Sequence, residues 1–408
     1  MKRILVTLAL VLTGMVLFAQ APHWEEYDYP EVLEEQPLIR ALMDKVSSDS
    51  LTHTIEHLTA YHTRRWDSRM VYQVQDWLFA QYRDLGYDTV FLHDFPVWYH
   101  DSLCETSDNV IAIKRGVVHP DEFVVCGAHY DSYNNAPGHP DSLRAPGADD
   151  NASGVAGILE TARILSRCTF DRSLMFCNFA AEEIGLIGSA AFAKDCADRG
   201  MRIVGYFNLD MIGYLEAGSD IHVNLLYTGQ DAPLAQYVTT MSHTYYPDMR
   251  IWQDWLPGGS DSDYSSFNRN GYAAIHLFED THHSSPYIHT PDDVLGLSVN
   301  NLDQAKRFTE LHLGLVATLG GLRSNDVGET LVDVLTVYPN PASETLTIRG
   351  LAMDRISVFN LLGQRVFTQP CAGASTIDLT VGSWAPGLYV LQVVDADGQV
   401  HSAKFLRR

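Results

Sequence analysis

The chain of 408 residues is predicted to be an α/β protein, with a mixed, mostly parallel sheet flanked by helices and a small all-β sandwich domain at its C-terminus. Two patterns predict this fold. Over residues 109–322, short apolar runs alternate with segments of helical periodicity, which is typical of α/β sheets. After residue 330, short alternating segments are separated by Pro-Asn, Leu-Gly and Asp-Gly turns, which indicates strands without intervening helices.

Helical segments are expected at both ends of the α/β region and after one glycine-bounded loop. Residues 51–85 are predicted to be helical because Val74, Leu78 and Tyr82 follow helical spacing and Gly86 ends the run. A second helix is expected over 151–166, and a third over 302–322 closes the region.

Buried strands are predicted from short apolar runs rich in β-branched and aromatic residues. A strand over 87–95 follows the first helix. The central strands are expected over residues 123–128, 174–180 and 203–209. In the C-terminal region, strands are expected over 334–338, 346–349, 356–359 and 388–393.

Composition divides the chain into five predicted parts. Lys2 and Arg3, an apolar run over 4–18 and small residues near Ala19 and Ala21 are typical of a cleaved signal peptide. The parts are a signal peptide at 1–20, an acidic extension at 21–50, a central domain at 51–323, a polar linker at 324–330 and the β domain at 331–408. Because no later run is comparably apolar, no stable membrane span is expected after signal cleavage.

The net charge of -23 excludes a class of partners. Nucleic-acid binding requires basic patches that neutralise phosphates, so no nucleic-acid partner is expected. Among the six cysteines, Cys126 and Cys177 lie in predicted buried strands and are expected to be packed thiols. Cys168 and Cys196 could pair in an exported protein, but the sequence leaves connectivity open. A thiolate zinc site is not expected because there is no Cys-x-x-Cys motif.

Metal-ligand residues follow the ends of the three central strands. His129 and Asp131 follow the first, a Glu-Glu pair at 182–183 the second, and Asp210 the third. A Gly-Ala-Asp-Asp-Asn-Ala-Ser-Gly loop at 147–154 lies between the first two. Because sites in open α/β sheets form beyond the carboxyl ends of the strands, these side chains are expected to converge. So many carboxylates would repel one another without divalent metal, and the His/Asp/Glu mixture suits zinc.

Five motifs together resemble the co-catalytic zinc aminopeptidases of the bacterial leucyl-aminopeptidase type, a fold shared with glutamate carboxypeptidases and glutaminyl cyclases. They are Gly-Ala-His-Tyr-Asp at 127–131, the acidic loop at 147–154, Ala-Glu-Glu-Ile-Gly-Leu-Ile-Gly-Ser at 181–189, Asn-Leu-Asp-Met-Ile-Gly at 208–213 and Ile-His-Thr-Pro-Asp-Asp at 288–293. The resemblance covers about residues 51–322. It implies that the central domain is a zinc peptidase that acts on peptide substrates.

The resemblance also implies roles for these residues in binding two zinc ions. Asp150 would bridge the two ions, and Glu182 would be the general base. His129 with Asp210 would complete one site, and Glu183 with His289 the other. Asp131, two residues after His129, is placed to fix the tautomer of that imidazole.

Several assignments stay open in the sequence. Asp149 is expected to cap the following helix. The residue that stabilises the oxyanion is either Tyr264 or Tyr287, since the family's Ser-Asp-His is here Ser-Asp-Tyr at 262–264. His53 and His57 match a His-x-x-Glu-His metalloprotease pattern but also fit an ordinary amphipathic helix.

Two alternatives to a peptidase fit the sequence less well. A glutaminyl-peptide cyclotransferase with one zinc would keep Asp150, Glu183 and His289, but the acidic loop and the Glu-Glu segment look more like the peptidases. A non-catalytic binding module would lack a ligand or the base, and none is missing here. His282 and His283 lie close to His289 and are expected to belong to a loop that faces the cleft.

The C-terminal domain resembles the type IX secretion sorting domain. The resemblance rests on Val-Tyr-Pro-Asn-Pro-Ala at 337–342, Ile-Ser-Val-Phe-Asn-Leu-Leu-Gly at 356–363, Gly-Leu-Tyr-Val-Leu-Gln at 387–392 and the final Lys-Phe-Leu-Arg at 404–407. It implies passage through the periplasm, recognition by the type IX secretion machinery, and a secreted or cell-surface location. The alternative is an adhesive or carbohydrate-binding β-sandwich.

Overall fold

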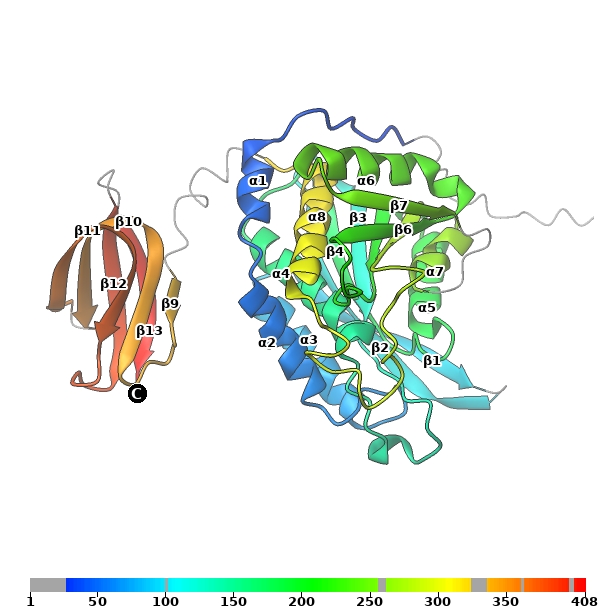
Figure 1. Ribbon diagram of the computed structural model, residues 1–408, viewed down its shortest axis with the longest axis horizontal. Helices are drawn as coiled ribbons and strands as arrows, with labels where there is room; N and C mark the ends of the chain where they lie inside the picture. The colour runs from blue at the N-terminus through cyan, green and yellow to red at the C-terminus, as the bar shows by residue number, and fades with distance from the viewer. Residues whose placement is uncertain (1–26, 100–101, 256–261, 324–335, 361–362, 396–399) are drawn as a thin grey trace, which may run out of the picture. The chain divides into compact units, whose positions relative to one another are not determined.

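The computed structural model describes residues 27–99, 102–255, 262–323, 336–360, 363–395 and 400–408 (Figure 1). The chain divides into two compact units, one up to Leu322 and one from Arg323. The predicted signal peptide at 1–20 and the linker at 324–330 lie outside the described residues, so the predicted domain boundaries stay predictions. Within the described ranges, no helix is long and apolar enough to cross a membrane.

In the described part of the first unit, eight strands form one mixed sheet in the order β1-β2-β4-β3-β5-β8-β6-β7. The four central strands β4, β3, β5 and β8 run parallel to one another, and β6 and β7 form a further parallel pair. The pairs β1–β2, β2–β4 and β6–β8 are antiparallel. This arrangement confirms the predicted fold class. The strands are β1 Thr89–Tyr99, β2 Ser102–Lys114, β3 His119–His129, β4 Arg172–Phe179, β5 Arg202–Leu209, β6 His222–Tyr227, β7 Arg250–Trp255 and β8 Ala274–Phe278.

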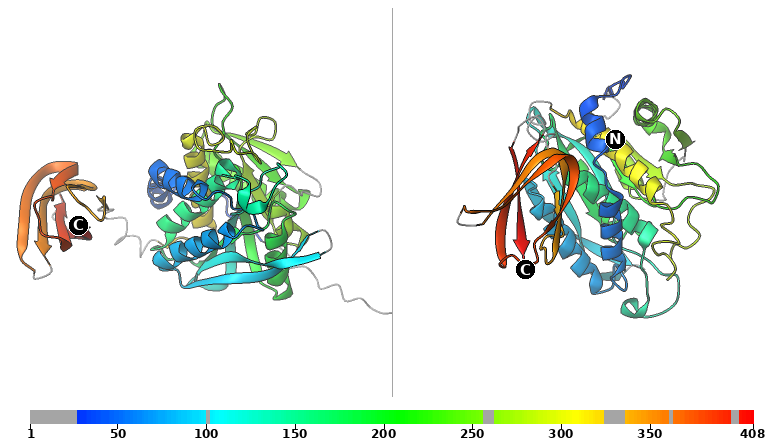
Figure 2. Two further views of the ribbon diagram at one scale, coloured as in Figure 1. Left: turned by 90° about the horizontal axis from the view of Figure 1, so that it is seen from below. Right: turned by 60° about the vertical axis from the view of Figure 1, so that its left-hand side comes forward.

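Helices cover both faces of this sheet (Figure 2). One layer holds α1, α2, α3, α4, α6 and α8, and the other holds α5 and α7. Aromatic side chains of α5 and α7 pack on the sheet in a core that includes Phe192, Tyr264 and Phe267. The helices are α1 Pro37–Met43, α2 Ser48–Thr59, α3 Met70–Asp84, α4 Gly154–Leu165, α5 Ile187–Asp198, α6 Ala232–Tyr245, α7 Tyr264–Arg269 and α8 Leu302–Gly320.

The single helix predicted over 51–85 is wrong: α2 ends at Thr59 and α3 begins at Met70. Between them the chain leaves the helix, and the side chain of Arg64 turns inward to donate hydrogen bonds to backbone carbonyls, including those of Tyr130 and Gly147. Tertiary hydrogen bonds therefore override the helical propensity of this stretch. The predicted helices at 151–166 and 302–322 are confirmed as α4 and α8.

Part of the predicted N-terminal extension packs onto the first unit. Helix α1 contacts α8 and buries Ile39, Leu42 and Met43. The N-terminus of α2 is held by Glu160 of α4, whose carboxylate accepts hydrogen bonds from the Ser47 backbone N–H and the Ser50 hydroxyl. This acidic segment therefore helps to cover the helical layer.

The contact between α4 and α8 contains a buried histidine that makes stability depend on pH. Thr161 Oγ1 lies 2.9 Å from His312 Nδ1, and burial lowers the pKa of His312 to about 3. The unfolded chain would take up a proton near pH 6.5 that the folded chain excludes. The stability contributed by neutral His312 is therefore present above pH 6.5 and is lost as the pH falls below it.

We expect His312→Gln to reduce the loss of stability on acidification, because glutamine can accept the Thr161 hydrogen bond but does not titrate. Between pH 7 and pH 5, the wild-type first unit should lose about 2 kcal/mol more free energy of unfolding than the variant. Urea unfolding of both proteins at the two pH values measures the difference. Equal losses in the two proteins would contradict the expectation.

The C-terminal unit is all β, as predicted. Its described strands form a five-stranded antiparallel sheet in the order β11-β10-β12-β13, with β9 paired to β10. The sheet packs around its own core, which includes Ile356, Leu391 and Phe405. The strands are β9 Thr336–Tyr338, β10 Thr345–Asn360, β11 Arg365–Thr380, β12 Gly387–Asp395 and β13 Val400–Arg407.

All six cysteines are free thiols in the structure. The pairing of Cys168 with Cys196 that the sequence left open is therefore not formed. Cys126 and Cys177 lie on β3 and β4 and are fully buried, as expected of packed thiols.

Candidate active site

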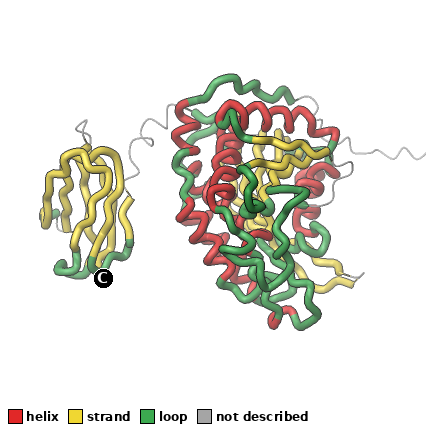
Figure 3. The backbone as a smooth tube through the Cα atoms, viewed as in Figure 1, coloured by secondary structure: helices red, strands yellow, loops and turns green. Residues whose placement is uncertain are grey.

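The candidate ligands converge at the carboxyl ends of the central strands. His129 is the last residue of β3 and pairs in register with Phe179, the last residue of β4. Glu182 follows β4 and Asp210 follows β5. Long loops gather on this side of the sheet (Figure 3). Because parallel strands end at the same edge, short distances along the chain bring these side chains to one patch.

Two imidazoles lie close to the carboxylate of Asp150, each next to a different oxygen. His129 Nε2 lies 3.2 Å from Asp150 Oδ1 and 3.4 Å from Asp210 Oδ1. His289 Nε2 lies 3.1 Å from Asp150 Oδ2 and 2.8 Å from Glu183 Oε2. The five predicted ligands thus form one continuous cluster, in which Asp150 presents a different oxygen to each histidine.

The arrangement of the donor atoms suits a bound divalent cation better than hydrogen bonding among the side chains themselves. His129 Nε2, Asp210 Oδ1 and Glu183 Oε1 are buried, yet none makes a hydrogen bond of acceptable geometry in the described structure. In the described residues, groups that could hold a metal ion are His129 with Glu182 and Asp210, and His129 with Asp150 and Glu183. A mixture of nitrogen and oxygen donors at this spacing suits zinc.

Asp131 orients two parts of the site at once. Its Oδ1 lies 3.5 Å from His129 Nδ1, and its backbone carbonyl lies 3.2 Å from the same nitrogen. The same carboxylate accepts hydrogen bonds from the backbone N–H groups of Glu182, at 3.1 Å, and Glu183, at 3.3 Å. The contact with His129 was predicted, whereas the link to the Glu-Glu segment depends on the pairing of β3 with β4.

The pKa values of the cluster are shifted because many carboxylates are buried close together and close to the two histidines. Burial and the nearby Asp150 raise the pKa of Glu183 to about 8. Burial opposes the charge on His289, but hydrogen bonds to Asp150 and Glu183 raise its pKa to about 11. Burial also raises the pKa of Glu182, and the surrounding carboxylates add to the shift. Metal binding must therefore displace protons from the histidines.

Asp149 does not cap helix α4, contrary to the expectation from the sequence. Its Oδ1 accepts a hydrogen bond from the Gly213 backbone N–H. The cap comes from Asn151, whose Oδ1 accepts from the Gly154 backbone N–H. The carboxylate of Asp149 is fully buried and ties the acidic loop to Gly213 after β5, so it is not directed to the start of α4.

Three further residues of the site were not predicted, and two of them, Asp293 and Ser262, support groups that carry candidate ligands. Asp293 accepts hydrogen bonds from the backbone N–H groups of Asp149 and Asp150 and so fixes the acidic loop. Ser262 donates a 2.6 Å hydrogen bond to Asp210 Oδ2. Asp263 is fully buried, and burial raises its pKa to about 7. The motifs contain these residues, but only the fold shows which groups they contact.

The two tyrosines proposed for the oxyanion differ in exposure. Tyr264 is fully buried, belongs to the core under α7 and packs 5.7 Å from the His276 ring. Tyr287 is partly exposed and lies two residues before His289. Burial therefore favours Tyr287 as the phenol that can reach a substrate.

The other histidine patterns do not belong to the cluster. His53 is exposed on α2, and His57 stacks on Trp77 with ring centroids 4.2 Å apart. His283 Nδ1 instead lies 3.4 Å from Asp280 and 3.6 Å from Glu216. The metalloprotease-like pattern is therefore part of an amphipathic helix, in agreement with the interpretation from periodicity.

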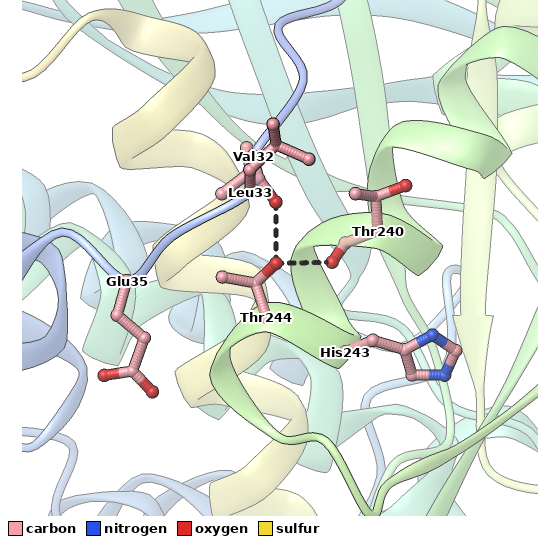
Figure 4. A pocket seen from close by; sticks show the side chains of 6 residues that line it. All are labelled: Val32, Leu33, Glu35, Thr240, His243 and Thr244. Carbon is pink, nitrogen blue, oxygen red and sulfur yellow. Dashed lines mark hydrogen bonds between the residues drawn. The ribbon is translucent and has the colours of Figure 1, made fainter.

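A pocket elsewhere on the first unit has no comparable chemistry. Thr244 Oγ1 donates a hydrogen bond to the Val32 carbonyl, which joins α6 to the N-terminal segment (Figure 4). Glu35 at its edge is engaged with Arg40 at 2.8 Å. No candidate ligand lines this pocket, so it is not the active site. Its lining residues are Val32, Leu33, Glu35, Thr240, His243 and Thr244.

Comparison with known families decides the class of the first unit. Residues 109–313, which contain all five motifs, match the model of peptidase family M28. Leucine aminopeptidase 1 of Fusarium vanettenii is 31% identical over 324 residues, covering 75% of this chain and 79% of that protein. The chain belongs to peptidase family M28. This M28 member is therefore a peptide hydrolase, as the motifs implied.

Solved structures show the same fold around the M28 motifs. The LapA aminopeptidase of Legionella pneumophila is 24% identical, with a TM-score of 0.60 over 72% of this chain and 78% of that chain. The glutaminyl cyclase of Porphyromonas gingivalis is 20% identical, with a TM-score of 0.55 over 67% of this chain and 98% of that chain. The fold by itself therefore does not separate peptidase from cyclase.

The second unit of the M28 peptidase also matches a known domain family. Residues 336–406 match the secretion system C-terminal sorting domain. This match confirms the predicted type IX sorting domain and identifies the chain as an exported, cell-surface or secreted protein. Recognition by the secretion machinery is the role that such a domain implies.

Proposed function

We propose that this M28 peptidase is a secreted, zinc-dependent aminopeptidase that removes N-terminal residues from peptides. The observation that carries the proposal is the pair of imidazoles that share Asp150, with Glu182 beside them. His129 Nε2 lies 3.9 Å from Glu182 Oε2, so the proposed base stands at the edge of the ligand cluster. The similarity to proteins named leucine aminopeptidase supports an aminopeptidase in particular.

Two zinc ions would be held by five side chains, with Asp150 shared between them. His129 and Asp210 would complete one site, and His289 and Glu183 the other. When bound, the ions would polarise the scissile carbonyl and acidify water. Asp150, Asp210 and Glu183 supply three negative charges against four positive, so the donor set leaves net positive charge for that task.

Glu182 would carry the proton during hydrolysis. Its carboxylate takes a proton from the attacking water and returns it to the amine nitrogen that leaves. Asp131 holds the Glu182 backbone N–H and so fixes the start of the segment that carries this side chain. Burial and the neighbouring carboxylates raise the pKa of Glu182, so its carboxylate has a higher affinity for the proton that it accepts in the first step.

A glutaminyl-peptide cyclotransferase is the second candidate, because the same fold supports it. Such an enzyme would need only Asp150, Glu183 and His289. The full ligand set here, with His129 and Asp210 in contact distance of each other, favours the peptidase.

The test is mass spectrometry of a peptide mixture incubated with purified, zinc-loaded protein. The mixture contains peptides with free N-termini, acetylated N-termini and N-terminal glutamine. We expect stepwise loss of N-terminal residues from the free peptides alone. Loss of ammonia from the glutamine peptides, with the chains otherwise intact, would instead assign a cyclase, and cleavage of the acetylated peptides would contradict an aminopeptidase.

Tyr287→Phe is expected to lower kcat by about 10- to 100-fold with little change in KM, because the phenol would stabilise charge that develops only in the transition state. Tyr264→Phe is the matched comparison, since its ring is buried in the core. Steady-state kinetics on a leucine-terminated peptide measure both. A larger loss of kcat in a stably folded Tyr264→Phe than in Tyr287→Phe would reverse the assignment.

A further inference from the structure

Arg64 is a fully buried cation whose four side-chain hydrogen bonds in the described structure all go to backbone carbonyls. It lies in the loop between α2 and α3 and has no exposed surface. Its Nε donates to the Tyr130 carbonyl at 2.9 Å, and its Nη2 donates to the Gly147 carbonyl at 2.8 Å. Its Nη1 donates to the carbonyls of Leu58, at 3.2 Å, and Pro146. One guanidinium thus joins three separate segments of the chain.

Two of these segments carry the candidate ligands. Tyr130 lies between His129 and Asp131, and Gly147 comes three residues before Asp150. The planar guanidinium fixes the directions of its hydrogen bonds, so it sets the spacing of the carbonyls that it joins. A shift of either segment would move His129 relative to Asp150.

The backbone around Arg64 reinforces the same junction. Ser132 Oγ accepts a hydrogen bond from the Arg64 backbone N–H at 3.1 Å and donates one to the Ala145 carbonyl at 2.8 Å. Gly147 has a φ of 56°, and a Cβ there would lie 2.7 Å from Arg64 Nη2. The loop therefore approaches the guanidinium so closely that only glycine fits.

Burial of this charge is costly, and carbonyl dipoles alone do not neutralise it. Burial lowers the pKa of Arg64 to about 10, and the nearby carboxylates of Asp293, Asp131, Asp150 and Glu183 oppose the shift. Arg64 therefore stays charged at neutral pH and is close enough to the acidic cluster to interact with its carboxylates.

We propose that Arg64 is a positioning residue that fixes the segment of His129 and Asp131 against the loop of Asp150, and so sets the separation of the two halves of the metal site. The proposal rests on the zinc site described under the proposed function. Arg64 contacts no candidate ligand side chain, so it acts through the backbone that carries these ligands.

Positioning and simple charge balance predict opposite effects on zinc affinity. If Arg64 acted only as a counter-charge for the carboxylates, its removal would leave a more negative site and zinc would bind more tightly. If it positions the two segments, its removal weakens zinc binding. Arg64→Lys keeps the charge but loses the planar fork, and Arg64→Met loses both.

The experiment measures zinc affinity by competition with a chromophoric chelator in the full-length protein and its variants. We expect Arg64→Lys and Arg64→Met each to raise the Kd for zinc by about 10- to 100-fold, as is typical when a residue that orients metal ligands is removed. With zinc saturating, kcat should fall while KM changes little. Leu319→Ala in α8 is the control, since Leu319 is buried and its loss costs stability without touching this junction.

Three outcomes would overturn the proposal: an unchanged zinc Kd in a folded Arg64→Lys, tighter binding in Arg64→Met, or equal weakening in Leu319→Ala. If the Arg64 variants fail to fold, Ser132→Ala tests the same junction more mildly and should raise the zinc Kd severalfold, and an unchanged Kd there counts against the proposal. Failure of the wild-type protein to bind zinc would instead refute the metal site itself.

Discussion

Glu182→Gln is expected to lower kcat by about 10²- to 10⁴-fold while the bound zinc stays at the wild-type level, because the amide cannot accept the proton of the attacking water. The side chain lies in a buried group of carboxylates, and its shape is kept by glutamine. Steady-state kinetics and elemental analysis of the purified variant measure the two quantities together.

Glu183→Gln is the matched comparison, since it makes the same chemical change one residue away. Glu183 Oε2 lies 2.8 Å from His289 Nε2, so this variant should lose zinc as well as activity. Loss of zinc in Glu182→Gln would make Glu182 a ligand. If Glu182→Gln that has been stripped of metal and reloaded with zinc still turned over at the wild-type rate, Glu182 would not be the general base.

Asp150→Ala should abolish both zinc binding and turnover, which is the largest effect expected of any single ligand. Its two carboxylate oxygens face different histidines, so its loss removes a donor from each half of the site. Asp210→Ala removes a donor from the His129 half alone. We therefore expect the second variant to retain one zinc ion and the first to retain none at the same free zinc concentration.

Elemental analysis after equilibrium dialysis against buffered zinc measures the two occupancies. Thermal unfolding serves as the control, because on addition of zinc Asp150→Ala should gain little stability, Asp210→Ala an intermediate amount and the wild type the most. Retention of both ions in Asp150→Ala would contradict the shared-carboxylate arrangement.

The convergence of the candidate ligands at the strand ends was predictable because their positions depend on local order along the chain. A buried apolar run that ends in His129 or Asp210 places that residue at the edge of a parallel sheet, whatever the rest of the fold does. The pairing of His129 with Phe179 across β3 and β4 then brings the Glu-Glu segment level with it.

The groups that hold these ligands were not predictable. Arg64 lies in a stretch with helical periodicity, and three of its four side-chain hydrogen bonds go to carbonyls 66 to 83 residues away in the sequence, which no local pattern indicates. Asp149 is of a residue type that often caps helices, but its buried carboxylate instead accepts a hydrogen bond from the Gly213 backbone N–H. The residue types at the strand ends thus indicated the candidate ligands. The hydrogen bonds that hold the segments carrying them are long-range and appear only in the fold.

The measurement that tests the central claim most directly is anomalous diffraction at the zinc edge from crystals of the zinc-loaded protein. The account predicts two peaks on either side of the Asp150 carboxylate, one bonded to His129 and Asp210 and the other bonded to His289 and Glu183, with Glu182 free of both. A single peak, or a bond from Glu182 to zinc, would contradict it.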